Sequence, residues 1–255
     1  MAQDLLVDVH ERVMRLTINR EERRNAMNPD VVNAIGAALD QAQSDREIRV
    51  VVLTGAGTKA FCSGADLQSG KSFQHDHSQP YVPFANLARK VRQLNIPLVA
   101  RVNGACMAGG IGLLSMCDMA VASEHAIFGL PEVKVGVFPS QVLSVLQHLI
   151  PRRVLNEMCI TGEPITAADA KAIGLVNHVS ADLDGKLAWL LDRVLDKSPA
   201  AIRRGLYTMK RVDGMSFEAA AAFTESQIAL TAMTEDAKEG QAAFREKRKP
   251  VWTGR

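Results

Sequence analysis

The chain has 255 residues, 47% of them hydrophobic and 23% charged, and its 30 basic and 28 acidic residues give a formal charge of +2. This composition is typical of a globular protein with a sizeable core, and the near balance of charge argues against a strongly basic nucleic-acid-binding protein. No apolar run is long enough to span a bilayer and residues 1–4 do not begin a signal peptide, so we expect a cytoplasmic protein without membrane contact.

The N-terminal third alternates strand and helix patterns. Residues 5–10 and 13–18 predict a hairpin that turns at Glu11 and Arg12. Asn28 followed by Pro29 is typical of a helix start, and the apolar positions after it predict a helix to about residue 44. Residues 50–54 then predict a buried strand.

A polar stretch, residues 71–83, predicts a loop. A helix at about 84–94 is expected to lead into a strand at residue 98, within the apolar segment 97–102. The loop contains His75 and His77, but two ligands are too few for a typical metal site, so we expect no metal.

The remaining chain predicts short strands followed mainly by helices. Strands are expected at 119–122, near 127–128 and at 176–179. Helices are expected at 139–149 and 152–160, and the sequence of residues 166–169 resembles a capping box. From residue 183 the pattern is helical to the end, with breaks near 198 and 213. The chain is therefore predicted to be an α/β body followed by helices.

Two turns of small residues each follow a predicted strand, at 55–67 and 101–118. Their glycines fit neither a dinucleotide-binding turn nor a phosphate-binding loop. Small residues allow close approach of backbone and ligand, and one N–H group from each turn can hold a single carbonyl oxygen. The pair of turns therefore indicates an oxyanion hole.

The four cysteines show no C-x-x-C spacing and stand mostly among apolar or small residues. We interpret them as reduced packing residues. They are Cys62, Cys106, Cys117 and Cys159.

Several of these segments carry a family resemblance. Ala60-Phe-Cys-Ser-Gly-Ala-Asp-Leu67, Val102-Asn-Gly-Ala-Cys-Met-Ala-Gly-Gly110 and Phe128-Gly-Leu-Pro-Glu132 strongly resemble the enoyl-CoA hydratase/isomerase (crotonase) superfamily. Further matches, in family order, are Asn19-Arg20, Asn25-Ala26, Thr161-Gly162-Glu163, Gly174-Leu-Val-Asn177 and Phe244-Arg-Glu-Lys-Arg-Lys249.

The resemblance implies an α/β fold, a crotonase-like spiral of strand-strand-helix repeats with a C-terminal helical region. The spiral core and its acyl-CoA site would occupy residues 1–195, and a helical trimerisation region residues 196–255. It also implies a homotrimer or a dimer of trimers. No cofactor is expected, because coenzyme A is part of the substrate. No sequence repeat is visible that would reveal the spiral.

The resemblance also implies the site residues. The N–H groups of Ala65 and Gly109 would stabilise an enolate, and Glu132 would act as general acid and base. A lysine that relatives often carry after the first turn is replaced by Gln68, with Lys71 as a possible substitute. The expected substrate-binding residues are Ser63, Gly64, Ala65, Asp66, Leu67, Gly109, Gly110, Phe138, Phe244 and Lys247, the last two reaching the CoA of a neighbouring subunit.

One position departs from the family pattern. Two-glutamate hydratases carry their second glutamate where this chain has Gly112. A single glutamate is the pattern of isomerases that convert 3-enoyl-CoA to 2-enoyl-CoA, so isomerisation is favoured. Hydration of 2-enoyl-CoA stays open as an alternative if another group, such as Asp66, Ser140 or Gln141, replaces the missing carboxylate.

Two other classes stay open. A non-catalytic member that binds acyl-CoA or RNA is one, although Glu132 and both turns argue against it. A hydrolase, decarboxylase or dehalogenase acting on a CoA thioester is the other. Such an enzyme needs an additional acid, base or nucleophile that the sequence does not place in space.

Overall fold

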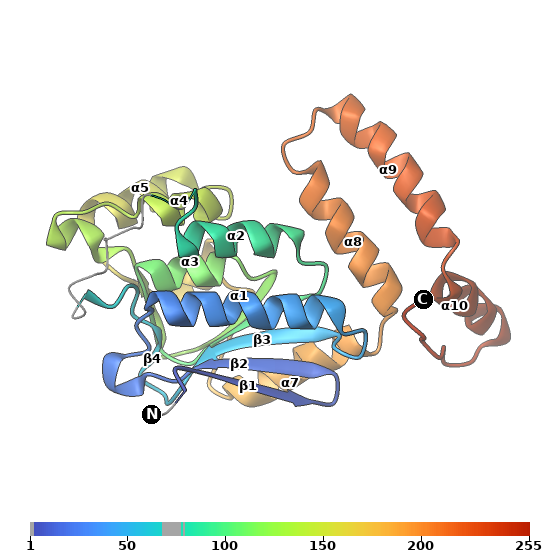
Figure 1. Cartoon of the computed structure of the whole chain (residues 1–255), viewed down its shortest axis with the longest axis horizontal. Coiled ribbons are helices and arrows are strands. Elements are labelled where there is room, and N and C mark those ends of the chain that lie inside the picture. The colour runs from blue at the N-terminus through green and yellow to red at the C-terminus, as the bar shows by residue number, and fades with distance from the viewer. Residues whose placement is uncertain (1–2, 68–77, 79) are drawn as a thin grey trace.

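The computed structural model describes residues 3–67, 78 and 80–255, and a six-stranded sheet lies at its centre (Figure 1). Its strand order is β1-β2-β3-β5-β7-β10. β1 and β2 form the predicted antiparallel hairpin, and the other pairs are parallel. The strands are Leu5–His10 (β1), Val13–Ile18 (β2), Val50–Gly55 (β3), Leu98–Val102 (β5), Met119–Ser123 (β7) and His178–Ser180 (β10).

A second sheet contains four very short strands, in the order β4-β6-β8-β9. The sequence did not predict β4, β6 or β9, because strands of two or three residues are too short to show periodicity. They are Ala60–Cys62 (β4), Ala105–Met107 (β6), Ile127–Gly129 (β8) and Ile165–Thr166 (β9).

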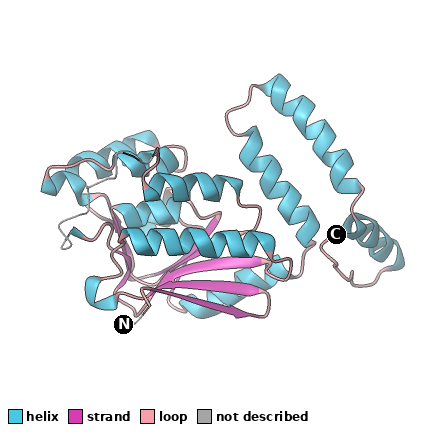
Figure 2. Ribbon diagram, viewed as in Figure 1, coloured by secondary structure: helices cyan, strands magenta, loops and turns pink. Residues whose placement is uncertain are grey.

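Helices cover both faces of the large sheet and extend beyond it (Figure 2). They are Pro29–Ser44 (α1), Pro83–Gln93 (α2), Gly109–Ser115 (α3), Ser140–Leu146 (α4), Arg152–Thr161 (α5), Ala167–Ala172 (α6), Leu183–Leu195 (α7), Pro199–Val212 (α8), Phe217–Ala232 (α9) and Glu235–Glu246 (α10).

The chain order shows the repeated unit. β3-β4-α2, β5-β6-α3 and β7-β8-α4 each place one strand in the large sheet, one in the small sheet and then a helix, with a short 3-10 helix before α4. Within the small sheet, Cys62 is in register with Cys106, and Cys106 with Phe128. The expected spiral of strand-strand-helix repeats is therefore confirmed. Because β4, β6 and β8 lie side by side in successive turns of the spiral, the segments that follow these strands are also neighbours.

Alternate residues of β3 enter two different cores. Val51 and Leu53 belong to the larger cluster, which also contains the buried faces of α1 and α2. Val50 and Val52 pack with Val99 and the apolar side of α7 on the opposite face. All six residues of β3 are buried, as expected for a parallel strand covered on both faces.

The three C-terminal helices form a separate layer. Figure 1 shows α8 and α9 side by side, with α10 near the C-terminus at the end remote from β4. The prediction of helix to the end of the chain is wrong for residues 247–255, which lie outside any helix or strand. This tail instead donates backbone hydrogen bonds to the carboxylate of Asp236, from the N–H groups of Thr253 and Gly254.

Local capping signals were predicted correctly. The Asn28 side chain accepts a hydrogen bond from the N–H of Val31, and Thr166 and Asp169 form the reciprocal capping box. The prediction that the four cysteines are packing residues is also confirmed: Cys62, Cys106 and Cys159 are buried, Cys117 is half-buried, and none is in a disulfide.

Gln68, Lys71, His75 and His77 lie outside the described residues. No helix among the described residues is long and apolar enough to cross a membrane.

Candidate active site

The first small-residue turn follows β4 and is held by the segment around Met27, which lies outside the named strands. Met27 forms an isolated parallel bridge with Ala65: its N–H donates to the carbonyl of Gly64 (2.7 Å), and its carbonyl accepts from Asp66 N–H (2.8 Å). Successive backbone groups of an extended segment point to opposite sides. The N–H of Ala65 therefore points away from Met27, and it has no acceptor among the described residues.

The second turn joins β6 to α3. Gly109 is the first residue of this helix, so its N–H has no acceptor within the helix. Ala108 before it has φ 52° and ψ −125°, a conformation that is costly for a residue with a side chain. Its N–H donates to the carbonyl of Gly129 (2.8 Å), which fixes the strained residue against β8.

The two turns lie against each other. A Cβ added to Gly64, whose φ is +100°, would lie 2.7 Å from the Cβ of Ala108. A Cβ added to Gly109 would lie 3.9 Å from the amide nitrogen of Ala65. A Cβ on Gly110 would lie 2.3 Å from the carbonyl oxygen of Cys62, so α3 approaches β4 too closely for a side chain there. The glycines thus bring the amide of Ala65 beside Gly109, the arrangement an oxyanion hole requires.

Glu132 follows β8, on the 3-10 helix Pro131–Val135 (η3). The register between Met107 and Gly129 places the start of this segment beside the second turn. The carboxylate is half-buried, and its buried Oε2 atom has no hydrogen-bond partner among the described residues. Burial raises the pKa of Glu132, and a hydrogen bond with its own backbone opposes the shift. A carboxylate with a raised pKa and an unused oxygen is suited to accept and return a proton.

Gly112 lies one helical turn after Gly109, so the two residues share a face of α3. A Cβ on Gly112 would lie 2.5 Å from Cζ of Phe84 and 3.3 Å from Cγ2 of Val142. The aromatic ring comes from α2 and the valine from α4. Apolar groups therefore occupy the space into which a side chain at position 112 would extend. The sequence did not identify Phe84 as a site residue, because its position depends on the packing of α2.

Four further expected site residues belong to the spiral. Ser63, Leu67 and Phe138 are partly or largely exposed, whereas Asp66 is buried. Leu67 and Phe138 are 51% and 48% exposed, and the hydroxyl of Ser63 donates to the carbonyl of Arg23 (3.4 Å). Asp66 is buried, and one of its carboxylate oxygens lies 2.7 Å from Nη2 of Arg20. This ion pair occupies the carboxylate of Asp66, one of the groups that could replace the missing glutamate.

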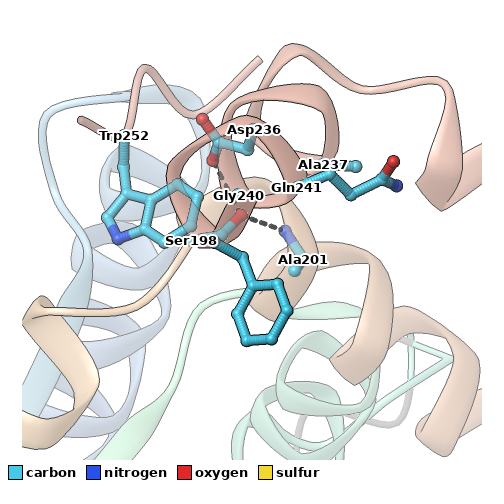
Figure 3. A pocket seen from close by; sticks show the side chains of 8 residues that line it. Ser198, Ala201, Asp236, Ala237, Gly240, Gln241 and Trp252 are labelled. Carbon is cyan, nitrogen blue, oxygen red and sulfur yellow. Dashed lines mark hydrogen bonds between the residues drawn. The ribbon is translucent and has the colours of Figure 1, made fainter. Parts of the chain in front are cut away.

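Phe244 and Lys247 lie on or after α10, far from β4 and α3 within one chain (Figure 1). The Phe244 side chain is 86% exposed and borders a cavity of about 360 Å³ (Figure 3). A single chain therefore does not bring these two residues to the turns. The cavity is lined by Ser198, Ala201, Asp236, Ala237, Gly240, Gln241, Phe244 and Trp252.

The described residues contain no group of three or more His, Cys, Asp or Glu side chains that could hold a metal ion. The two turns each offer one backbone N–H donor, at Ala65 and Gly109, and η3, next along the spiral, offers one half-buried carboxylate. This arrangement can stabilise negative charge on a carbonyl oxygen while a proton is moved nearby.

Comparison with known proteins places these features in context. A family model described as enoyl-CoA hydratase/isomerase matches residues 8–255. Enoyl-CoA hydratase EchA19 of Mycobacterium tuberculosis is 35% identical over 99% of this chain and 97% of its own length. The 2,3-dehydroadipyl-CoA hydratase of Escherichia coli is 32% identical over 99% of each chain. A crystal structure of an enoyl-CoA hydratase from Mycobacterium smegmatis has 34% identity and a TM-score of 0.90, covering 98% of this chain and 99% of its own.

Proposed function

The chain belongs to the enoyl-CoA hydratase/isomerase family, and from this premise we propose that it moves a proton on an enoyl-CoA thioester. The thioester oxygen accepts hydrogen bonds from the N–H groups of Ala65 and Gly109, and Glu132 carries the proton. Each fixed donor of this kind contributes about 3 to 4 kcal/mol to stabilising the transition state. The reaction requires no cofactor, since coenzyme A arrives as part of the substrate.

The proposed reaction is isomerisation of 3-enoyl-CoA to 2-enoyl-CoA. The ionised Glu132 takes a proton from C2, and the electron pair moves into a dienolate whose oxygen faces the two donors. The protonated Glu132 then returns a proton at C4, and the double bond lies between C2 and C3. One carboxylate is sufficient because the proton that leaves is balanced by the proton that returns.

The observation that favours isomerisation is the packing at Gly112. Hydration by two carboxylates needs a second acid at this position, together with room for water. Here the ring of Phe84 and a methyl group of Val142 border the position instead. An apolar wall supports proton transfer without addition of water.

Hydration is the second candidate, because the relatives described above are named hydratases. The proposed test supplies purified protein with a short 2-enoyl-CoA and, separately, a 3-enoyl-CoA. Products are separated by chromatography and their masses are determined by mass spectrometry, with Glu132→Gln as the control. Movement of the double bond without a change in mass is expected. Glu132-dependent gain of water by the 2-enoyl thioester would overturn isomerisation in favour of hydration, and turnover that persists at full rate in E132Q would overturn the mechanism. If neither thioester reacts, a different acyl-CoA reaction or a binding role replaces the proposal.

The proposed assembly is a homotrimer or a dimer of trimers. Large apolar side chains are exposed on the C-terminal helices, and among the residues of α9 only Gln227 is buried. Most of the apolar surface of this helix thus lacks cover in a single chain. Light scattering coupled to gel filtration should give three or six chain masses, and a monomer would contradict the proposal. The exposed side chains include Met209, Phe217, Ile228 and Met233.

A cytoplasmic location stays a prediction.

A further inference from the structure

Arg20, just after β2, makes three charged or polar contacts in a largely buried position. Its side chain is 12% exposed. Nη1 donates to the carbonyl of Ala26 (2.6 Å) and Nη2 to Oδ2 of Asp66 (2.7 Å). Nε lies 3.2 Å from the carboxylate of Asp4. Hydrogen bonds between ionised groups are shorter and stronger than neutral ones, so this guanidinium holds its partners firmly.

Two of these contacts lie next to the bridge that orients the first turn. Ala26 precedes Met27, and Asp66 follows Ala65. Arg20 therefore binds both sides of the Met27–Ala65 bridge, although 46 residues separate it from Asp66 in the sequence. Because this bridge directs the Ala65 N–H away from Met27, the position of the guanidinium is linked to the direction of that donor.

A buried asparagine anchors the same segment to the spiral. Asn25 is 1% exposed and has φ 56°. Its Nδ2 donates to the carbonyls of Ala56 (3.0 Å) and Ala60 (2.7 Å), and its Oδ1 accepts from the N–H of Arg20 (3.2 Å). The segment that carries Arg20 is thus fixed to the β3–β4 connection, so the guanidinium acts from a rigid base.

We propose that Arg20 is a positioning residue for the oxyanion hole, which it orients through Asp66 and the Ala26 carbonyl. This inference rests on the proposed function of the Ala65 N–H. Arg20 does not contact the reacting atoms in this role. Its loss should weaken stabilisation of the enolate more than binding of the substrate, since only the transition state places a full charge on the oxygen.

The test measures exchange of α-protons of butanoyl-CoA in D₂O by mass spectrometry. In this reaction Glu132 removes a proton from C2, and the enolate is quenched by a deuteron acquired from solvent. The variants are Arg20→Met, Arg20→Lys and Glu132→Gln. Arg101→Met is the matched control, because Arg101 is 16% exposed and paired with Asp184 at 2.7 Å. Affinity for butanoyl-CoA is measured separately by calorimetry.

We expect R20M to exchange about 10 to 100 times more slowly than the wild type, as for a displaced donor, with affinity changed less than about threefold. R20K should recover part of the rate, and R101M should match the wild type. Exchange at the wild-type rate by folded R20M, or an equal loss in R101M, overturns the inference. If R20M does not fold, the variant D66N tests the inference in its place. Its exchange rate should be about 3 to 10 times lower than that of the wild type, because a neutral hydrogen bond to Arg20 is weaker. An unchanged exchange rate in D66N would overturn the inference. Absence of exchange by the wild type, or full exchange by E132Q, contradicts the proposed function instead.

Discussion

The tip of the Phe84 ring lies against Gly112: a Cβ at residue 112 would lie 2.5 Å from Cζ of that ring. The contact joins α2 to α3 at the face that also carries Gly109. It is a close-packing relationship, and neither residue is polar. The absence of a second carboxylate at this position is therefore accompanied by packing that fills its place.

Replacing Gly112 by alanine should destabilise the protein, because the ring of Phe84 must move to admit the methyl group. We expect a loss of about 1 to 3 kcal/mol in the free energy of unfolding, measured by urea denaturation. Gly36→Ala is the control. The nearest atom to a Cβ at residue 36 would be in the flexible side chain of Lys90, at 3.4 Å. G36A should therefore gain about 0 to 1 kcal/mol of stability from the higher helix propensity of alanine. Equal stability of G112A and wild type would contradict the packing.

Local features were predictable from the sequence. Apart from the approach of the two small-residue turns, contacts between distant segments were not. The caps at Asn28 and Thr166 depend on residues three positions apart, and both were predicted. The strands β4 and β6 are stabilised by pairing with each other across the fold, and their three residues carry no periodic signal. Tertiary pairing, and not local propensity, determines them.

The same distinction applies to the site. The resemblance indicated Ala65, Gly109 and Glu132 because each stands in a contiguous motif. The roles proposed for Phe84 and Arg20 depend on contacts with Gly112 and Asp66, which are distant in sequence. No spacing rule predicts such contacts, so these two roles could be inferred only from the structure.

Activity should depend on pH through Glu132. Only the ionised carboxylate can take a proton, and burial raises its pKa above the ordinary glutamate value. The rate constant kcat/KM should therefore fall as pH decreases through this raised pKa. E132Q should lose this acid limb and about 10²- to 10⁴-fold in rate. A limb at or below the ordinary glutamate pKa would contradict the assignment.

The same carboxylate should reduce stability at neutral pH. A raised pKa means that folding favours the protonated form, so the contribution of Glu132 to stability is lost as pH rises through the pKa. E132Q should consequently have a higher Tm than the wild type at neutral pH, and the difference should shrink in acid. Thermal melts at several pH values measure it. A lower Tm for E132Q at neutral pH would show that the ionised carboxylate stabilises the fold.

Gly64→Ala should impair catalysis by displacing one turn from the other. Alanine would be strained at φ +100°, and its Cβ would lie 2.7 Å from the Cβ of Ala108. We expect kcat to fall about 100-fold, the scale of a misplaced donor. Gly214→Ala is the matched control, since Gly214 has φ +87° with no atom near its added Cβ. G214A should lose about 1 to 3 kcal/mol of stability from strain alone and retain activity. Similar kcat values for the two variants would contradict the role of the contact.

Asp236 should stabilise the attachment of the C-terminal tail in a pH-dependent way. The residue is 1% exposed, and burial alone would raise its pKa. Hydrogen bonds from the Ser198 hydroxyl and the backbone N–H groups of Thr253, Gly254 and Ala200 outweigh burial and lower the pKa below the ordinary aspartate value. Folding therefore favours the ionised form. Its stabilisation is present above the ordinary pKa and is lost as pH falls through the lowered one.

Asp236→Asn should consequently lower stability by about 1 to 3 kcal/mol at neutral pH, because the amide accepts fewer hydrogen bonds and its NH₂ group faces other donors. Thermal melts should show the deficit shrinking in acid, where the wild-type carboxylate also becomes neutral. Asp213→Asn is the control: Asp213 is 60% exposed and pairs with Arg92 at the surface, so a change below about 1 kcal/mol is expected. If D236N melts like the wild type at neutral pH, or if its deficit is the same at every pH, the carboxylate of Asp236 does not hold the tail through its charge.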